Sequence, residues 1–124
     1  MYDPANFRLD EGVALITGAG AGIGRAIAET FASAGSAVVV TDRDATAANT
    51  VAEAINAAGG RSVGVACDVT READLEAAVA RAVDAFGKLT ILVNNAGGGG
   101  PKPFDMPMSD MRLAFELNVF SVFR

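Results

Sequence analysis

Three glycines, Gly18, Gly22 and Gly24, lie between an apolar run at residues 13–16 and a stretch with helical spacing. Backbone N–H groups at a strand-to-helix turn bind a pyrophosphate, because the first helical turn leaves them unpaired and the helix dipole favours an anion. Glycine lets the phosphate approach the backbone closely. The segment therefore indicates a dinucleotide site. The same spacing also suits a tight turn without a ligand, since its GxxxGxG order departs from the common GxGxxG.

An acidic residue follows the second apolar run, about twenty residues beyond the glycines, where dinucleotide-binding folds carry their ribose ligand. This residue is Asp42, and Arg43 comes directly after it. A carboxylate there accepts hydrogen bonds from the adenosine ribose and repels a 2′-phosphate, so the sequence favours NAD over NADP. Arg43 softens that preference. The alternative interpretation of Asp42 is an ordinary exposed acid in a loop.

Polar side chains also follow the third and fourth apolar runs. Asp68 and Val69 end the third run, and residues 94–97, Asn-Asn-Ala-Gly, end the fourth. Carboxyl ends of parallel strands meet at one edge of a sheet, where such folds place their ligand. Asp68 beside an apolar residue suits an adenine ring. The alternatives are that Asp68 caps the turn into Thr70 and that the asparagines form Asx turns.

Short β-branched runs alternate with segments of helical spacing, which is typical of βαβ units. We expect strands at 13–16, 37–41, 62–66 and 90–94. Thr70 is the expected N-cap of the third helix. The expected buried helix faces are Ile23, Ile27 and Phe31, then Ala47, Val51, Ile55 and Ala58, then Leu75, Val79, Val83 and Phe86. The predicted fold class is α/β, a Rossmann-type doubly wound parallel sheet with strand order 3-2-1-4 and helices on both faces.

The last segment, residues 110–124, predicts a helix that is apolar on nearly every side. Such a helix needs cover from more chain or from another subunit, so we expect a homo-oligomer. Asn118 lies inside this segment, where asparagine lowers helix propensity and needs a buried partner. A packing asparagine is the alternative to a functional one.

Composition excludes several classes of protein. The 124 residues carry a formal charge of −5, which argues against binding nucleic acid. One cysteine, Cys67, forms neither an internal disulfide nor a zinc cluster, so we expect no metal and a buried spectator thiol. Residues 1–6 lack the features of a signal peptide, and no run has the length of a membrane span. A cytoplasmic protein without a membrane partner is expected.

Together these motifs resemble the short-chain dehydrogenase/reductase family, over essentially the whole chain and in family order. They are Thr17-Gly18-x-x-x-Gly22-x-Gly24, Asp68-Val69, Asn94-Asn95-Ala96-Gly97 and Asn118. The resemblance implies hydride transfer between NAD and a small-molecule alcohol or ketone. It also implies the contacts of individual residues: Gly18, Ile23 and Gly24 with the pyrophosphate region, Asp42 with the adenosine ribose, Asp68 and Val69 with the adenine, Asn95 and Gly97 with the nicotinamide-side ribose, and Asn118 through a water with the catalytic lysine.

The region from Asn94 to Ser121 most resembles bacterial family members that oxidise a secondary alcohol such as the 7α-hydroxyl of a steroid or bile acid. Family members carry a serine and a Tyr-x-x-x-Lys beyond the point where this chain ends. The one tyrosine here is Tyr2 and histidine is absent. We therefore expect one domain, residues 1–124, that is the inactive amino-terminal half of such an enzyme. The alternatives are a reductase for 3-oxoacyl or sugar-alcohol substrates and a non-catalytic nucleotide-binding or interaction half-domain.

Overall fold

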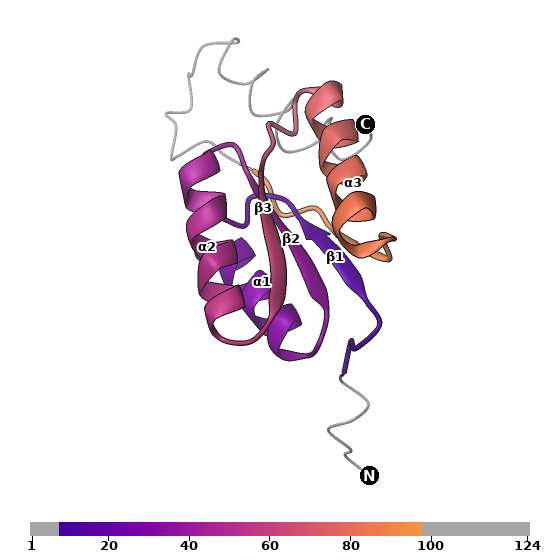
Figure 1. The fold of residues 1–124 in the computed structure, drawn as a ribbon. Helices are drawn as coiled ribbons and strands as arrows, with labels where there is room; N and C mark the ends of the chain where they lie inside the picture. Colours follow the sequence, from indigo (N-terminus) through magenta and orange to yellow (C-terminus); the bar gives the residue numbers. More distant parts are fainter. Residues whose placement is uncertain (1–7, 98–124) are drawn as a thin grey trace.

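A computed structural model describes residues 8–97, which form a four-stranded parallel sheet with three crossover helices (Figure 1). The elements are β1 (Val13–Ile16), α1 (Gly22–Ser33), β2 (Ala37–Asp42), α2 (Ala45–Ala57), β3 (Arg61–Ala66), α3 (Glu72–Phe86) and β4 (Ile91–Val93). The order across the sheet is β3-β2-β1-β4, so the predicted 3-2-1-4 order is confirmed. The expected helix at 110–124 and Asn118 lie outside the described residues.

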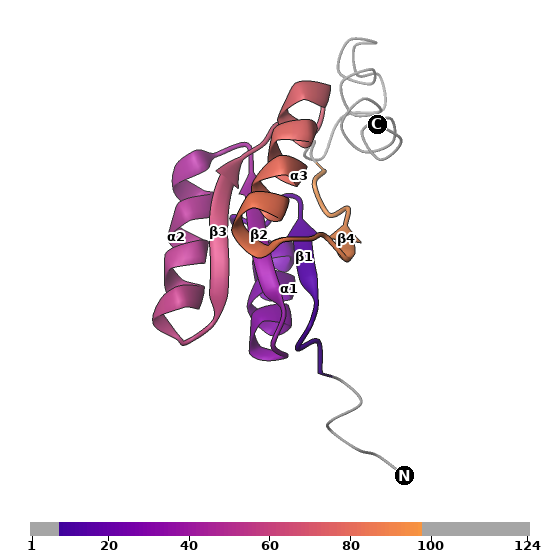
Figure 2. The same ribbon diagram turned by 45° about the vertical axis from the view of Figure 1, so that its right-hand side comes forward.

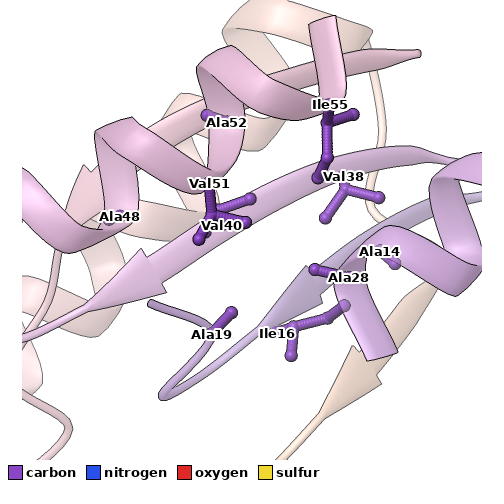
Figure 3. Close-up of a cluster of buried hydrophobic side chains, with 10 residues drawn as sticks. All are labelled: Ala14, Ile16, Ala19, Ala28, Val38, Val40, Ala48, Val51, Ala52 and Ile55. Atoms are coloured by element: carbon purple, nitrogen blue, oxygen red, sulfur yellow. The ribbon is translucent and has the colours of Figure 1, made fainter. Parts of the chain in front are cut away.

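The pleat divides the side chains of β1 and β2 between two faces, because successive residues of a strand point to opposite sides. Figure 2 shows α3 on the opposite side of the sheet from α1 and α2. Figure 3 shows the cluster on the α1 and α2 side. It contains Ala14, Ile16, Ala19, Ala28, Val38, Val40, Ala48, Val51, Ala52 and Ile55. The α3 side contains Leu15, Val39, Cys67, Val69, Ala78 and Ala82. Both faces of the central strands are therefore covered, as their continuous apolar sequence predicts.

The buried face of α3 differs from the expected one. Val79 and Val83 are 43% and 48% exposed, whereas Ala78 and Ala82 are fully buried. Adjacent positions on a helix differ by 100°, so the valines flank the line of contact. The small alanines let the helix backbone lie close to the sheet. The prediction was wrong for the two valines, because it ranked side chains by hydrophobicity and not by the room available. The other two expected residues, Leu75 and Phe86, do pack against the core on this side of the sheet.

The buried faces of α1 and α2 and the N-cap of α3 also differ from the expected ones, by smaller amounts. Ile23 is 75% exposed at the start of α1, although Ile27 and Phe31 pack against the core as expected. Ala58 is the C-cap of α2 and is exposed, whereas Ala48 and Ala52 lie on the buried face of the helix with the expected Val51 and Ile55. The N-cap of α3 is Arg71, without a side-chain hydrogen bond, so the expectation for Thr70 was wrong. The Thr70 hydroxyl instead donates to the carboxylate of Asp68.

Parallel strands give the sheet two different edges. The carboxyl edge gathers the ends of the strands and the N-termini of the helices that follow them, and the amino edge gathers the C-termini of those helices. In the N-terminal turn of α1 the helix has no side-chain cap and no acidic residue. Its first N–H groups therefore have neither a carboxylate partner nor a repelling charge in front of them. Every expected site residue that the structure describes lies at the carboxyl edge.

Candidate cofactor-binding site

The glycine loop between β1 and α1 needs its glycines for two different reasons. Gly18 and Gly22 adopt φ angles of 64° and 60°, in the left-handed region that side chains disfavour. A Cβ on Gly22 would meet no atom within 4 Å, so open space lies in front of that residue. A Cβ on Gly24 would collide with the Gly18 carbonyl oxygen and the Asn95 side-chain amide. The loop is thus closely packed behind and open in front, a cradle that fits a phosphate group.

The carboxylate of Asp42 ties this loop to the end of β2. Its Oδ2 accepts a hydrogen bond from the Gly20 N–H at 2.9 Å, and its Oδ1 accepts one from the Asp44 N–H at 2.9 Å. A Cβ on Gly20 would lie 2.7 Å from Asp42 Oδ2, so a fourth glycine is required that sequence reasoning did not assign. Its presence inside the motif was the available signal. The Thr41 carbonyl also accepts the Ala19 N–H at 2.8 Å, so β2 holds the loop at two points.

Asn95, after β4, holds the same loop from the other side. Its Nδ2 donates to the carbonyl oxygens of Thr17, at 3.2 Å, and Gly18, at 3.1 Å. The buried hydroxyl of Thr17 accepts the N–H groups of Asn95 and Ala96 at 3.0 and 2.9 Å. The Asn95 amide nitrogen therefore faces the glycine loop. Thr17 is a second residue that sequence reasoning did not assign a role, because its partners lie 78 and 79 positions away.

Asp68 forms the turn that was the alternative interpretation of this residue. Its Oδ1 accepts the Thr70 N–H at 3.0 Å and the Thr70 hydroxyl at 2.6 Å. These hydrogen bonds, followed by the charges of Arg71 and Arg43, hold the pKa of Asp68 below its usual value against the opposing effect of burial. Asp68 is therefore ionised at neutral pH. Within residues 8–97 its Oδ2 makes no hydrogen bond, which leaves one carboxylate oxygen for a ligand.

The neighbours of Asp68 take different positions. Val69 is 6% exposed and its side chain belongs to the core on the α3 side. Arg43 is exposed, and its charge acts on Asp68. Cys67 is buried, and desolvation, followed by the charges of Asp74 and Asp68, raises its pKa to about 11. The Cys67 thiol is therefore protonated at neutral pH and is not a nucleophile.

The structure links these positions in one row along the carboxyl edge. Asn95 contacts the glycine loop, Asp42 contacts Gly20, and the Asp42 carbonyl accepts the Cys67 N–H at 2.9 Å. Ile23 stands exposed at the start of α1, and Gly97 is exposed after β4. The row offers amide donors at the glycine loop and carboxylate acceptors at Asp42 and Asp68. It suits a ligand with phosphates in its middle and hydroxyl and amino donors at one end.

Two further properties concern residues 8–97 as a set. No group of three or more His, Cys, Asp or Glu side chains among them is placed to hold a metal ion. In the same part of the chain, no helix has both the length and the apolar character to cross a membrane. The described carboxyl edge contains no tyrosine or histidine that could exchange a proton with an alcohol.

The chain belongs to the short-chain dehydrogenase family, because the model of that family, described as short chain dehydrogenase, matches residues 12–124. It is 58% identical over 123 residues to 7α-hydroxysteroid dehydrogenase of Escherichia coli strain K12, covering 99% of this chain and 48% of that protein. It is 36% identical over 119 residues to D-threitol dehydrogenase of Mycolicibacterium smegmatis, covering 95% of this chain and 46% of that protein. The chain thus spans about half the length of these curated relatives.

A solved structure supports the same assignment. It is 7α-hydroxysteroid dehydrogenase complexed with NADH and 7-oxo glycochenodeoxycholic acid. The present chain superposes on it with a TM-score of 0.93 at 58% identity, covering 99% of this chain and 48% of that one. The Rossmann-type fold predicted from the sequence is therefore confirmed.

Proposed function

We propose that the protein containing this chain is an NAD-dependent oxidoreductase and that residues 1–124 form its cofactor-binding unit. The observation that carries the proposal is the Asp42 carboxylate, fixed at 2.9 Å from the Gly20 N–H beside the open cradle. Its charge favours the free ribose hydroxyls of NAD and repels the 2′-phosphate of NADP. The similar enzyme that was solved with NADH supports this cofactor.

Each site residue receives a role in this proposal. Amides around Gly18, Gly22, Ile23 and Gly24 hold the pyrophosphate, Asp42 holds the adenosine ribose, and Asp68 Oδ2 accepts a hydrogen bond from the adenine amino group. Val69, whose side chain is buried, contributes its backbone at the adenine. Arg43 flanks the adenosine end, and Asn95 and Gly97 lie toward the nicotinamide end. NAD supplies the hydride acceptor, and Asn118 belongs to the relay that takes the hydroxyl proton.

We propose a 7α-hydroxysteroid or bile acid as the substrate, oxidised to the ketone with loss of one hydride and one proton. The 58% identity to 7α-hydroxysteroid dehydrogenase supports this substrate. The similarity to D-threitol dehydrogenase favours a sugar alcohol as the second candidate. Neither the glycine loop nor the Asp42 and Asp68 carboxylates select the alcohol, since they face the cofactor.

Two properties of the whole protein complete the proposal. We place it in the cytoplasm, where Cys67, the one cysteine of these 124 residues, stays reduced. We also propose a homo-oligomer, in which a second subunit, together with the rest of the protein's chain, covers the apolar sequence of residues 110–124.

The test is NADH formation by the full-length gene product. We expect NADH to form from NAD⁺ and glycochenodeoxycholic acid, with the 7β-epimer of that bile acid as the matched control. The 7β-epimer and D-threitol should give rates at least about tenfold lower, since a well-placed hydroxyl contact is worth that factor or more. Equal rates with both epimers would overturn the substrate, and activity only with NADP⁺ would overturn the cofactor.

A further inference from the structure

Asp74, in the first turn of α3, contacts the turn that carries Asp68. Its Oδ2 accepts a hydrogen bond from the Asp68 N–H at 3.0 Å, and the side chain is half-buried. Asp68 in turn binds Thr70 through Oδ1, and its carbonyl accepts the Arg71 N–H at 2.9 Å. The turn is thus closed on itself by the bonds of Asp68, and the Asp74 carboxylate anchors the start of that turn to the helix.

We propose that Asp74 is a positioning residue for the adenine end of the cofactor, acting through Asp68. This inference rests on the proposed function. With Asp74 in place, the Asp68 backbone is fixed at its N–H and its carbonyl, and Oδ1 is occupied by Thr70. Oδ2, which makes no hydrogen bond within residues 8–97, is then held in one position, where it can accept a hydrogen bond from an adenine amino group. A fixed acceptor binds more strongly than a mobile one, because less freedom is lost on binding.

A second acid in the same turn separates this role from ordinary stabilisation of a helix. Glu72 and Asp74 are both in the first turn of α3, where a negative charge interacts favourably with the helix dipole. Glu72 is exposed and makes no hydrogen bond within residues 8–97, whereas Asp74 binds Asp68. Removing either carboxylate costs the helix a similar interaction with its dipole. Only the removal of Asp74 frees the turn.

The test compares NADH with its hypoxanthine analogue, in which an oxygen replaces the adenine amino group. Fluorescence titration of the full-length gene product measures both Kd values. We expect the wild-type protein to prefer NADH by about tenfold, the effect of one hydrogen bond to a charged acceptor. Asp74→Ala should weaken NADH binding and reduce this preference to about twofold. Asp74→Asn should keep it, because the amide oxygen accepts the same N–H, and Glu72→Ala should keep it too.

The possible results separate this inference from the proposed function. No NADH binding by the wild-type protein would overturn both. Binding of NADH without preference over the analogue would show that Asp68 does not read the amino group and would overturn the inference alone. An Asp74→Ala variant that loses affinity for both ligands equally would reduce Asp74 to a structural residue. The same loss of preference in Glu72→Ala would attribute the effect to the helix charge.

Discussion

At the two edges of this sheet, charged side chains of opposite sign bind the backbone. At the carboxyl edge, acceptors bind backbone N–H groups: Asp42 binds Gly20 and Asp74 binds Asp68. At the amino edge, guanidinium groups bind carbonyls: Arg8 donates to Ser33 at 3.1 Å and Arg61 donates to Gly35 at 3.3 Å. Helix N-termini meet at the first edge and C-termini at the second, so the backbone presents partial positive charge at one edge and partial negative charge at the other.

The amino edge also has a groove of about 540 Å³ between the C-terminal ends of α1 and α2. Its lining is Arg8, Glu29, Ala32, Ser33, Gly35, Ala54, Ile55, Ala58, Gly59 and Gly60. Helix carbonyls near this groove repel an anion. In the proposed function, the charge of the backbone ends, more than the size of a hollow, decides where a phosphate-bearing cofactor binds. The carboxyl edge has that charge.

Substituting one glycine at each edge gives the largest expected difference in affinity for NADH. Gly24→Ala should raise the Kd for NADH about 100-fold, because its Cβ collides with the Gly18 carbonyl oxygen and Asn95, and such overpacking costs up to about 3 kcal/mol. The control is Gly59→Ala at the amino edge, where φ is 93° and no atom lies within 4 Å of the new Cβ. That variant should lose about 1 kcal/mol of stability through strain.

Titration with NADH and thermal unfolding of both full-length variants check this contrast. The Gly59→Ala variant should bind NADH as the wild-type protein does. A Gly59→Ala variant that bound NADH as poorly as Gly24→Ala would show that both edges contribute to the site.

A smaller effect is expected at Asp42. Asp42→Ala should weaken NADH binding about tenfold, because the ribose and the Gly20 N–H both lose an acceptor. It should not gain the same affinity for NADPH, since the loop is loosened for either cofactor. Asp42→Asn retains an oxygen for Gly20 and removes the charge, so it should lose less NADH affinity and bind NADPH better than Asp42→Ala does. Titrations of each variant with NADH and with NADPH measure these affinities. An Asp42→Ala variant that bound NADPH as tightly as the wild-type protein binds NADH would contradict the role of the contact between Asp42 and the loop.

The strands and their order could be predicted from the sequence because they depend on local pattern. The prediction for β1 was correct at both ends, and the 37–41 prediction for β2 missed only Asp42. Right-handed crossovers then left little choice of topology. The buried face of α3 could not be predicted from hydrophobicity alone. Ala78 and Ala82 are buried because their small side chains let the helix lie close to the sheet.

The place of the candidate site residues at the carboxyl edge was predictable from the sequence, but their contacts were not. The glycines and Asp42 stand out by spacing, and both lie where expected. The inward direction of the Asn95 amide depends on Thr17, 78 residues earlier, so no local pattern shows it. The role of Asp74 could not be predicted either, because acidic residues are common in the first turn of a helix. Only the folded turn brings the Asp74 carboxylate to the Asp68 N–H.

The measurement that tests the central claim most directly is a titration of the full-length gene product with NADH and, in parallel, with NADPH. We predict saturable binding of NADH with a Kd at least about tenfold lower than that for NADPH, the effect expected of one unfavourable charge contact at Asp42. Equal affinities, or tighter binding of NADPH, would contradict the claim that the carboxyl edge of this sheet is built for NAD.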